Sequence, residues 1–280
     1  MSSLCVPFCD YLTVTIPHSQ YHSGSEGTEG RVTSKGKVCS QYGSDRLSAR
    51  IDAFLGSIGA SLSESLGASH WLVGERGQFR ISSRGKVQII SASGEALSHL
   101  RAHKMLGEYL QLLGDGPHRV TRMDVAYDEP KAAPPILRGL YRLGTRSPGV
   151  SLSRKRATCT RYLEQDNEGF ETGTVYFGRR TAQVQLAAYD KRHERLCRCQ
   201  PDPGPLVRYE VRVRSGFSPS LADAFQPAAI FWHFMPTSVL KTPPKVPTWS
   251  PGGLGFHLPA KPALDPATAL ERRLASSVEL

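Results

Sequence analysis

The 280-residue chain has no hydrophobic run long enough to span a bilayer, since its longest apolar stretch covers only residues 228–235. This excludes a membrane-spanning protein. The first residues carry neither a positive cluster nor a long apolar segment, so we expect no secretory signal and predict a cytoplasmic location. With 39% hydrophobic residues, the chain still has enough apolar material for a globular core that needs no disulfide or metal to hold it.

The cysteines of the sequence do not have the spacing of a zinc site. The six cysteines are Cys5, Cys9, Cys39, Cys159, Cys197 and Cys199. Their close pairs have three residues and one residue between them, and no histidines accompany them at zinc-finger spacing. We interpret the cysteines as free thiols, and the sequence assigns no role to Cys5 and Cys9 or to Cys197 and Cys199.

Acidic residues are outnumbered: 25 Asp and Glu accompany 35 Lys and Arg, which gives a formal net charge of +10. Half of that excess lies in residues 154–214, where 13 basic residues accompany 8 acidic ones. A basic chain of this kind favours a polyanionic partner. We therefore expect phosphate contacts in that segment.

Changes in composition divide the chain into four segments. Alternating apolar and polar residues predict a strand at the end of residues 1–16, and the Ser, Gly and Lys of residues 17–44 predict a mobile loop. Residues 45–235 carry the patterns of the core, which is continuous with the first strand. Residues 236–280 predict a proline-rich linker followed by a short helix that opens at Asp265.

The order of elements predicted in the core does not match a parallel α/β fold. The expected helices cover residues 45–58, capped by Asp45, and 95–113; the expected strands cover 71–73 and 79–81 as a hairpin, 87–90, 120–127, 172–189 as a folded pair, and 206–213. Their connections are too short for crossover helices, and no glycine-rich phosphate loop follows a strand. We predict an α+β fold with a mostly antiparallel or mixed β-sheet, packed helices and a polar sheet face that forms the active site.

Three of the predicted strands have one apolar and one polar face. Alternation with a period of two assigns these side chains to the polar faces: Arg122, Asp124 and Asp128 in the first, Arg208, Glu210, Arg212 and Arg214 in the second, and Tyr189 in the third. If the three strands are neighbours, Asp124, Glu210 and Tyr189 share one face among arginines, with Lys191 close behind. This is a set of groups suited to phosphoryl transfer.

The chemistry of these side chains is compatible with attack on a phosphodiester. Carboxylate oxygens are the ligands that Mg²⁺ or Mn²⁺ prefers, and such an ion polarises a phosphodiester. A tyrosine hydroxyl could attack the phosphorus once nearby positive charge lowers its pKa, leaving a phosphotyrosine. The residues alone leave a simpler interpretation open, in which Asp124 and Glu210 form cross-strand salt bridges and Lys191 belongs to a solvated charged run. Tyr162 and Tyr176 are competing candidates for the nucleophile.

Three segments resemble, in order and separation, the replication initiation factors of filamentous phages and rolling-circle plasmids, which are tyrosine nickases. That family carries an Arg-Ile-Asp strand, a Tyr-x-Gly-Ser-Arg strand leading to Tyr-Asp/Asn-Lys, and an Arg-x-Glu strand. The corresponding segments here are Arg122-Met-Asp124, Tyr176-Phe-Gly-Arg-Arg180 leading to Tyr189-Asp-Lys191, and Arg208-Tyr-Glu210. The strand that starts at Asp10 also resembles the opening strand of the family, so the likeness covers roughly residues 10–235. Arg179 stands where the family has serine, and Ala187 where an arginine is common.

The resemblance implies a metal-dependent, site-specific nickase that starts rolling-circle replication at an origin. By this likeness Tyr189 is the nucleophile of a 5′-phosphotyrosine, Arg180 and Lys191 bind the scissile phosphate, and Asp124, Glu210 and Asp128 hold Mg²⁺ or Mn²⁺. The basic residues expected to contact origin DNA, double-stranded or single-stranded, are Arg122, Arg179, Arg192, Arg208, Arg212 and Arg214. A phage-encoded protein would act in the cytoplasm of its bacterial host.

Two other functions use the same residues differently. A non-catalytic DNA-binding regulator of phage replication or transcription would need the arginines but neither Tyr189 nor the acids. A tyrosine recombinase would need an Arg, His-x-x-Arg and Tyr arrangement that the sequence does not offer convincingly. The tail could contact a host helicase, although a passive linker is the simpler interpretation, and a homodimer is left open.

Overall fold

The computed structural model describes residues 6–17, 42–65, 68–147, 149–152, 155–165, 171–243, 245–246 and 248–250. In these ranges the chain forms seven α-helices and a ten-stranded antiparallel sheet, which confirms the predicted α+β class. Within the same ranges, no helix is long and apolar enough to cross a membrane.

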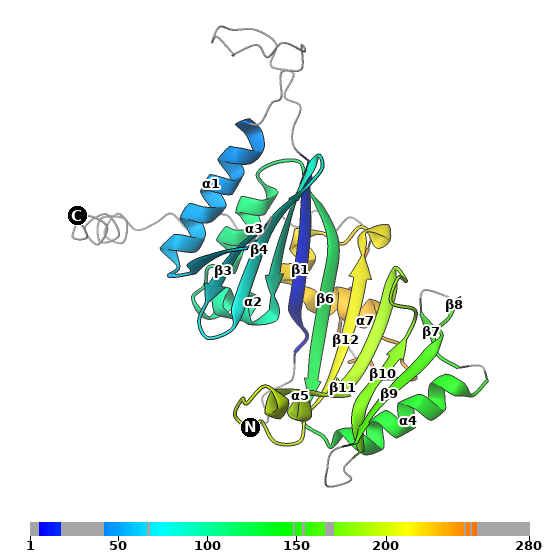
Figure 1. Ribbon diagram of the computed structural model, residues 1–280. Helices are drawn as coiled ribbons and strands as arrows, with labels where there is room; N and C mark the ends of the chain where they lie inside the picture. Colours follow the sequence, from blue (N-terminus) through cyan, green and yellow to red (C-terminus); the bar gives the residue numbers. More distant parts are fainter. Residues whose placement is uncertain are drawn as a thin grey trace, which may run out of the picture.

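The large sheet runs through the whole molecule (Figure 1). Its strand order is β2-β3-β4-β5-β1-β6-β12-β11-β10-β9. The bounds are β1 (Phe8–Pro17), β2 (Ser61–Ser65), β3 (Ala68–Val73), β4 (Gly77–Arg84), β5 (Val87–Ser93), β6 (Arg119–Glu129), β9 (Cys159–Gln165), β10 (Glu171–Phe177), β11 (Val184–Asp190) and β12 (Val207–Arg214). Two short strands, β7 (Ser151–Leu152) and β8 (Lys155–Arg156), form a separate pair.

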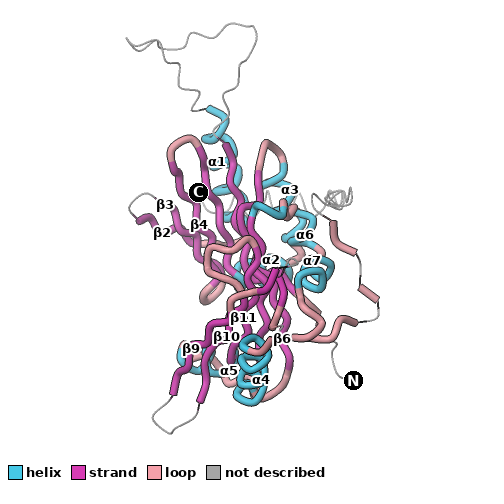
Figure 2. Tube along the Cα trace, turned by 90° about the vertical axis from the view of Figure 1, so that its right-hand side faces the viewer, coloured by secondary structure: helices cyan, strands magenta, loops and turns pink. Residues whose placement is uncertain are grey.

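Most of the helices cover one side of this sheet, and two of them border its opposite, polar side. Their bounds are α1 (Tyr42–Ser57), α2 (Gly94–Ala102), α3 (Leu106–Gly114), α4 (Ala133–Thr145), α5 (Lys191–Cys197), α6 (Leu221–Phe225) and α7 (Pro227–Phe234). Figure 2 shows α3, α6 and α7 together on the same side of the strands, while Figure 1 shows α4 along β9 and β10, and α5 at the end of β11. The polar side chains of the central strands are therefore left on the opposite side.

Aromatic rings join the helices to the sheet in the core. Tyr109 of α3 is buried, and its ring lies 5.9 Å from that of Phe54 and 5.4 Å from that of Phe79. On the other half of the sheet, Gly144 lets α4 approach β9 closely, because a Cβ there would lie 2.5 Å from the Cys159 sulfur. Burial of such side chains supplies the main driving force for this packing.

Most predicted strands are confirmed, and one predicted helix is wrong. The hairpin corresponds to β3 and β4, the folded pair to β10 and β11, and the remaining strands to β5, β6 and β12. The helix predicted over residues 95–113 is instead divided into α2 and α3. Lys104 adopts a left-handed φ of 59°, and the N–H of Met105 donates to the carbonyl of Leu100 at 2.7 Å, a bond that ends α2 in the manner of a Schellman cap.

The predicted segment boundaries also need correction. Helix α1 begins at Tyr42, three residues before the predicted cap, and most of the predicted loop lies outside the described residues. The first part of the predicted linker still packs against the domain. Trp249 is buried, and its indole N–H donates to the Asp223 carboxylate at 2.9 Å. The helix expected at Asp265 lies outside the described residues.

Candidate active site

The predicted neighbourhood of three polar strands is confirmed. Strand β12 lies between β6 and β11, and its register places Arg208 opposite both Asp128 and Tyr189. Two residues further along, Glu210 lies opposite Ala187 and Ala126, and Arg212 opposite Gln185 and Asp124. Because side chains alternate along a strand, Asp124, Glu210 and Tyr189 project from the same face of the sheet.

A bulge in β1 adds a fourth group, Asp10, to this face. Strict alternation would point Asp10 into the core with Leu12. The register of β1 against β6 shifts between Cys9 and Tyr11, so that Cys9 and Leu12 both face the core and are almost fully buried. The extra residue between them turns its side chain to the polar face, where its carboxylate accepts from Arg208 at 3.0 Å. Two polar residues between two core residues are the sequence signal that would have revealed this bulge.

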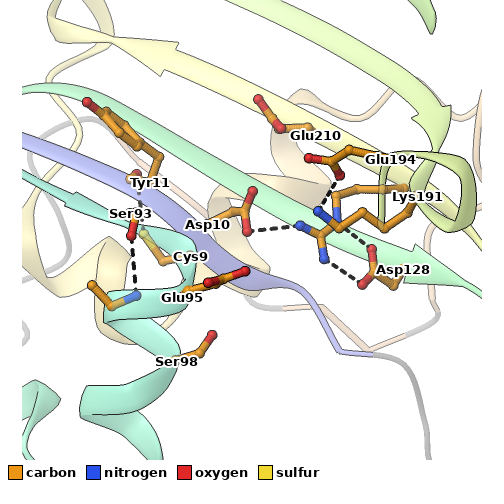
Figure 3. A network of polar contacts seen from close by, with 12 residues as sticks. Cys9, Asp10, Tyr11, Ser93, Glu95, Ser98, Asp128, Lys191, Glu194 and Glu210 are labelled. Carbon is orange, nitrogen blue, oxygen red and sulfur yellow. Dashed lines mark hydrogen bonds and ion pairs between the residues drawn. The ribbon is translucent and has the colours of Figure 1, made fainter. Parts of the chain in front are cut away.

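The four side chains line one open cleft of about 600 Å³. Its floor is the sheet, and one wall is the turn from β5 into α2, where Gly94 lies against Asp10. The other wall is α5 and the residues after it, which contribute Lys191, Arg195 and Arg198. Figure 3 shows Asp10, Glu210, Glu194 and Lys191 gathered in this region. Asp10, Arg76, Arg195 and Arg198 were not among the predicted site residues.

Asp124 is held by two arginines that the sequence assigned to DNA. Its carboxylate is only 2% exposed. Arg122 binds both of its oxygens, one at 2.9 Å, and Arg212 donates to both at 3.2 Å. Arg212 also donates to Glu210 at 3.1 Å. The salt-bridge interpretation of these acids therefore describes Asp124 well.

Arg208 has a comparable internal role. Its side chain is buried, and it donates to both oxygens of Asp128, at 2.6 and 2.7 Å, as well as to Asp10. The hydrogen bond to Asp128 and the charge of Asp10 outweigh the effect of burial, so that the pKa of Arg208 is raised. Asp128 is not among the residues that line the cleft. Arg208 thus connects Asp10 to Asp128 of β6.

The environment of Tyr189 differs from the expectation that positive charge lowers its pKa. Burial raises the pKa well above its usual value, the charge of Glu210 raises it further, and Arg208 only partly opposes this. The ammonium of Lys191 lies 5.9 Å from the centre of the tyrosine ring. That ammonium forms an ion pair with Glu194, which also pairs with Arg198 at 2.9 Å. The neutral phenol is therefore the stable form in this arrangement.

Asp10 and Glu210 have raised pKa values. For Glu210, burial is the largest cause, followed by the charges of Asp124 and Asp10. For Asp10, burial is again the largest cause, and the positive charges of Arg208 and Lys191 oppose it. A bound cation would relieve the repulsion that Asp10 and Asp124 exert on Glu210.

The donor chemistry of this cleft fits Mg²⁺ or Mn²⁺ in type, because carboxylate oxygens are hard ligands. Glu210 and Asp10 are better candidates than the predicted Asp124 and Asp128, since the latter two bind arginines through both oxygens. No three His, Cys, Asp or Glu side chains within the described residues form a group that could hold a metal ion.

The remaining predicted residues lie around the cleft rather than in it. Arg179 and Arg180 are exposed in the connection between β10 and β11 and line a neighbouring groove. Arg214 donates to the carbonyl of Arg180 at 2.9 Å. Arg192 is exposed on α5 and pairs with Asp202 at 2.7 and 2.8 Å. The DNA contacts assigned to these arginines remain a prediction.

Comparison with known proteins finds no matching protein family, and no curated protein sequence matches the chain. Among solved structures, the chain is similar to the structure of a rolling circle replication initiator protein from Geobacillus stearothermophilus. The similarity has a TM-score of 0.43 and 15% sequence identity, and it covers 75% of this chain and 74% of the other. A similarity at this level assigns no function by itself.

Proposed function

We propose that this chain is a replication initiator that cleaves one strand of origin DNA through Tyr189. The observation that carries the proposal is the cleft itself, in which a tyrosine from β11 faces carboxylates from β1 and β12 and cations from α5. A purely structural sheet face has no need of a tyrosine among charged side chains. The setting is proposed to be the cytoplasm of a bacterial host.

The proposed reaction is a phosphodiester transfer. The hydroxyl oxygen of Tyr189 forms a bond to phosphorus, its proton leaves to solvent, and the bond between phosphorus and the 3′ oxygen breaks. The 3′ oxygen keeps the electron pair and takes up a proton, which leaves a 5′-phosphotyrosine and a free 3′-hydroxyl. Lys191, Arg195 and Arg198, which line the cleft, would bind the phosphate oxygens and stabilise their charge.

Asp10 and Glu210 are the proposed holders of Mg²⁺ or Mn²⁺. Such an ion would add positive charge close to Tyr189 and would polarise the phosphodiester. Arg208 orients Asp10 for this purpose through their hydrogen bond. Arg122 and Arg212 act on Asp124, which is proposed as a fixed negative charge beneath the site rather than as a direct ligand.

The test is a cleavage assay on supercoiled DNA that carries the replication origin of the element encoding the protein, with and without Mg²⁺ or Mn²⁺. Products are separated under denaturing conditions to reveal nicks and a protein–DNA adduct. We expect metal-dependent nicking with an adduct that is lost in Tyr189→Phe and kept in Tyr176→Phe, a tyrosine of the neighbouring strand. An adduct that persists in Tyr189→Phe would overturn the assignment of the nucleophile.

One observation favours a second function, a DNA-binding regulator without catalysis. The two arginines on Asp124 satisfy that acid internally, as in a purely structural salt-bridge network. Such a protein would bind DNA with an affinity that falls steeply with salt. Salt-dependent binding without nicking, unchanged in Tyr189→Phe, would support this alternative over the initiator.

A further inference from the structure

A second groove lies on the same sheet face beside the candidate active site. It has a volume of about 540 Å³ and extends over β9, β10 and β11. Its lining includes Tyr162, Tyr176, Arg179, Arg180 and Arg212, and Arg212 also lines the cleft that holds Tyr189. The two hollows therefore share a boundary, and a bound chain could pass from one to the other.

The strand register aligns this groove with Tyr189. Thr174 of β10 pairs with Tyr189 on one side and with Tyr162 of β9 on the other. The backbones of Tyr162 and Tyr189 are thus two strand spacings apart, or about 10 Å. Tyr176 lies in the next row of the same face, opposite Ala187. The three tyrosines consequently project from one surface.

Tyr162 is unusually exposed for an aromatic residue on a sheet. Its exposed fraction is 60%, and its ring meets that of Tyr176 edge to face, with centres 5.7 Å apart. Both tyrosines line the groove. Exposed aromatic rings in a basic groove are typical of surfaces on which the bases of a single-stranded nucleic acid stack.

The charge of the groove suits a nucleic-acid backbone. Arg179 and Arg180 are both exposed at its margin. Neither forms an ion pair with a residue in the described part of the chain, in contrast to Arg122, Arg208 and Arg212. Their guanidinium groups are therefore available for phosphates.

We propose that this groove binds an unpaired DNA strand, with bases stacked on Tyr162 and Tyr176 and phosphates on Arg179 and Arg180. The inference rests on the proposed function in one respect, since the strand held here would be the one delivered to Tyr189. It specifies the form of the substrate: the origin is bound with its strands separated next to the scissile phosphate. Duplex DNA buries its base faces and cannot stack in this way.

The test measures binding rather than cleavage. Fluorescence anisotropy of a labelled oligothymidylate gives the affinity of the full chain and of Tyr162→Leu and Tyr162→Phe. Loss of one stacking interaction weakens binding about 5- to 150-fold, so Tyr162→Leu should show a loss of this size and Tyr162→Phe almost none. A labelled duplex of the same length should bind both variants as it binds the unaltered chain.

A matched control is Phe225→Leu, because Phe225 is a partly exposed ring on α6, on the helical side of the sheet. It should leave binding unchanged, and circular dichroism should show that all variants are folded. Arg179→Gln should reduce the slope of affinity against salt by about one phosphate contact. Equal affinity for oligothymidylate in Tyr162→Leu and the unaltered chain, or an equal loss for the duplex, would overturn the proposal. Oligothymidylate binding that depends on Tyr162 in a protein that never nicks would reject the proposed function and keep this one.

Discussion

Arg208 provides the sharpest test of how the candidate site is held together. It joins three strands, because it lies on β12 and donates to Asp128 on β6 and to Asp10 in the bulge of β1. Its side chain is 9% exposed, and those of Asp10 and Asp128 are 21% and 26% exposed. The substitution Arg208→Met keeps much of the side-chain volume and removes the charge.

The expected cost can be worked from these contacts. Removing one partner of a buried ion pair costs about 3–5 kcal/mol, because it leaves an uncompensated charge. Both carboxylates retain some contact with water, so we expect a value near the lower limit, about 3 kcal/mol of unfolding free energy at pH 7. The cation–π contact of Arg208 with the Phe8 ring, 4.9 Å from its centre, is lost as well.

The pH dependence has a defined sign. Burial already raises the pKa of Asp10, and Arg208 opposes this, so without Arg208 that pKa in the folded protein should rise further above the unfolded value of about 3.9. The folded state then binds more protons than the unfolded state, so its stability falls as pH rises through this range. The destabilisation should therefore be largest at pH 7 and should shrink as pH is lowered toward 4.

The assay is urea unfolding of the unaltered chain and of Arg208→Met at several pH values, with circular dichroism used to monitor the loss of structure. Arg192→Met serves as the control, since Arg192 pairs with Asp202 on the exposed surface, and it should have little effect. Arg208→Met combined with Asp128→Asn should recover part of the lost stability. Unchanged stability of Arg208→Met at pH 7, or a destabilisation that grows as pH falls, would refute this account of the network.

Two further predictions concern the surroundings of the site. A Cβ on Gly94 would lie 2.3 Å from a carboxylate oxygen of Asp10 and 2.7 Å from its backbone oxygen, so Gly94→Ala should lose about 1–3 kcal/mol of stability in urea unfolding. The control Gly139→Ala, with open space around it in α4, should instead gain about 0.5–1 kcal/mol. Equal effects of the two substitutions would contradict the packing argument. Burial raises the pKa of the Cys9 thiol to about 12, so mass spectrometry after iodoacetamide treatment at pH 8 should find the exposed Cys197 labelled and Cys9 labelled only after unfolding. Rapid labelling of Cys9 in the folded protein would count against its burial.

Local alternation was sufficient to predict the composition of the polar face. Strands β6, β11 and β12 each follow a period of two, so their sequences alone separate Asp124, Glu210 and Tyr189 from the core residues beside them. The same reasoning found the hairpin of β3 and β4 from its turn. It also predicted the α+β class, because the order of elements leaves no room for crossover helices.

Other features depend on contacts between distant segments and have little local signature. Helix α4 was not predicted, since its sequence begins with alanine and two prolines and contains two glycines, and its position depends on packing against β9 and β10. The break between α2 and α3 was missed because the apolar spacing continues across it, while only the left-handed Lys104 ends the first helix. Trp249 was predicted to belong to a linker, but it packs into the domain, where a buried carboxylate on α6 accepts a hydrogen bond from its indole N–H.

The amino-acid sequence by itself determined which side chains each strand offers to the polar face, because that depends only on the pleat of a single strand. Tertiary structure decided what those side chains do to one another. It turned Asp10 onto the face through a bulge, bound Arg122, Arg208 and Arg212 to carboxylates, and raised the pKa of Tyr189 instead of lowering it. Charge interactions and burial depend on distances between strands far apart in the chain, and only the folded sheet brings those strands together.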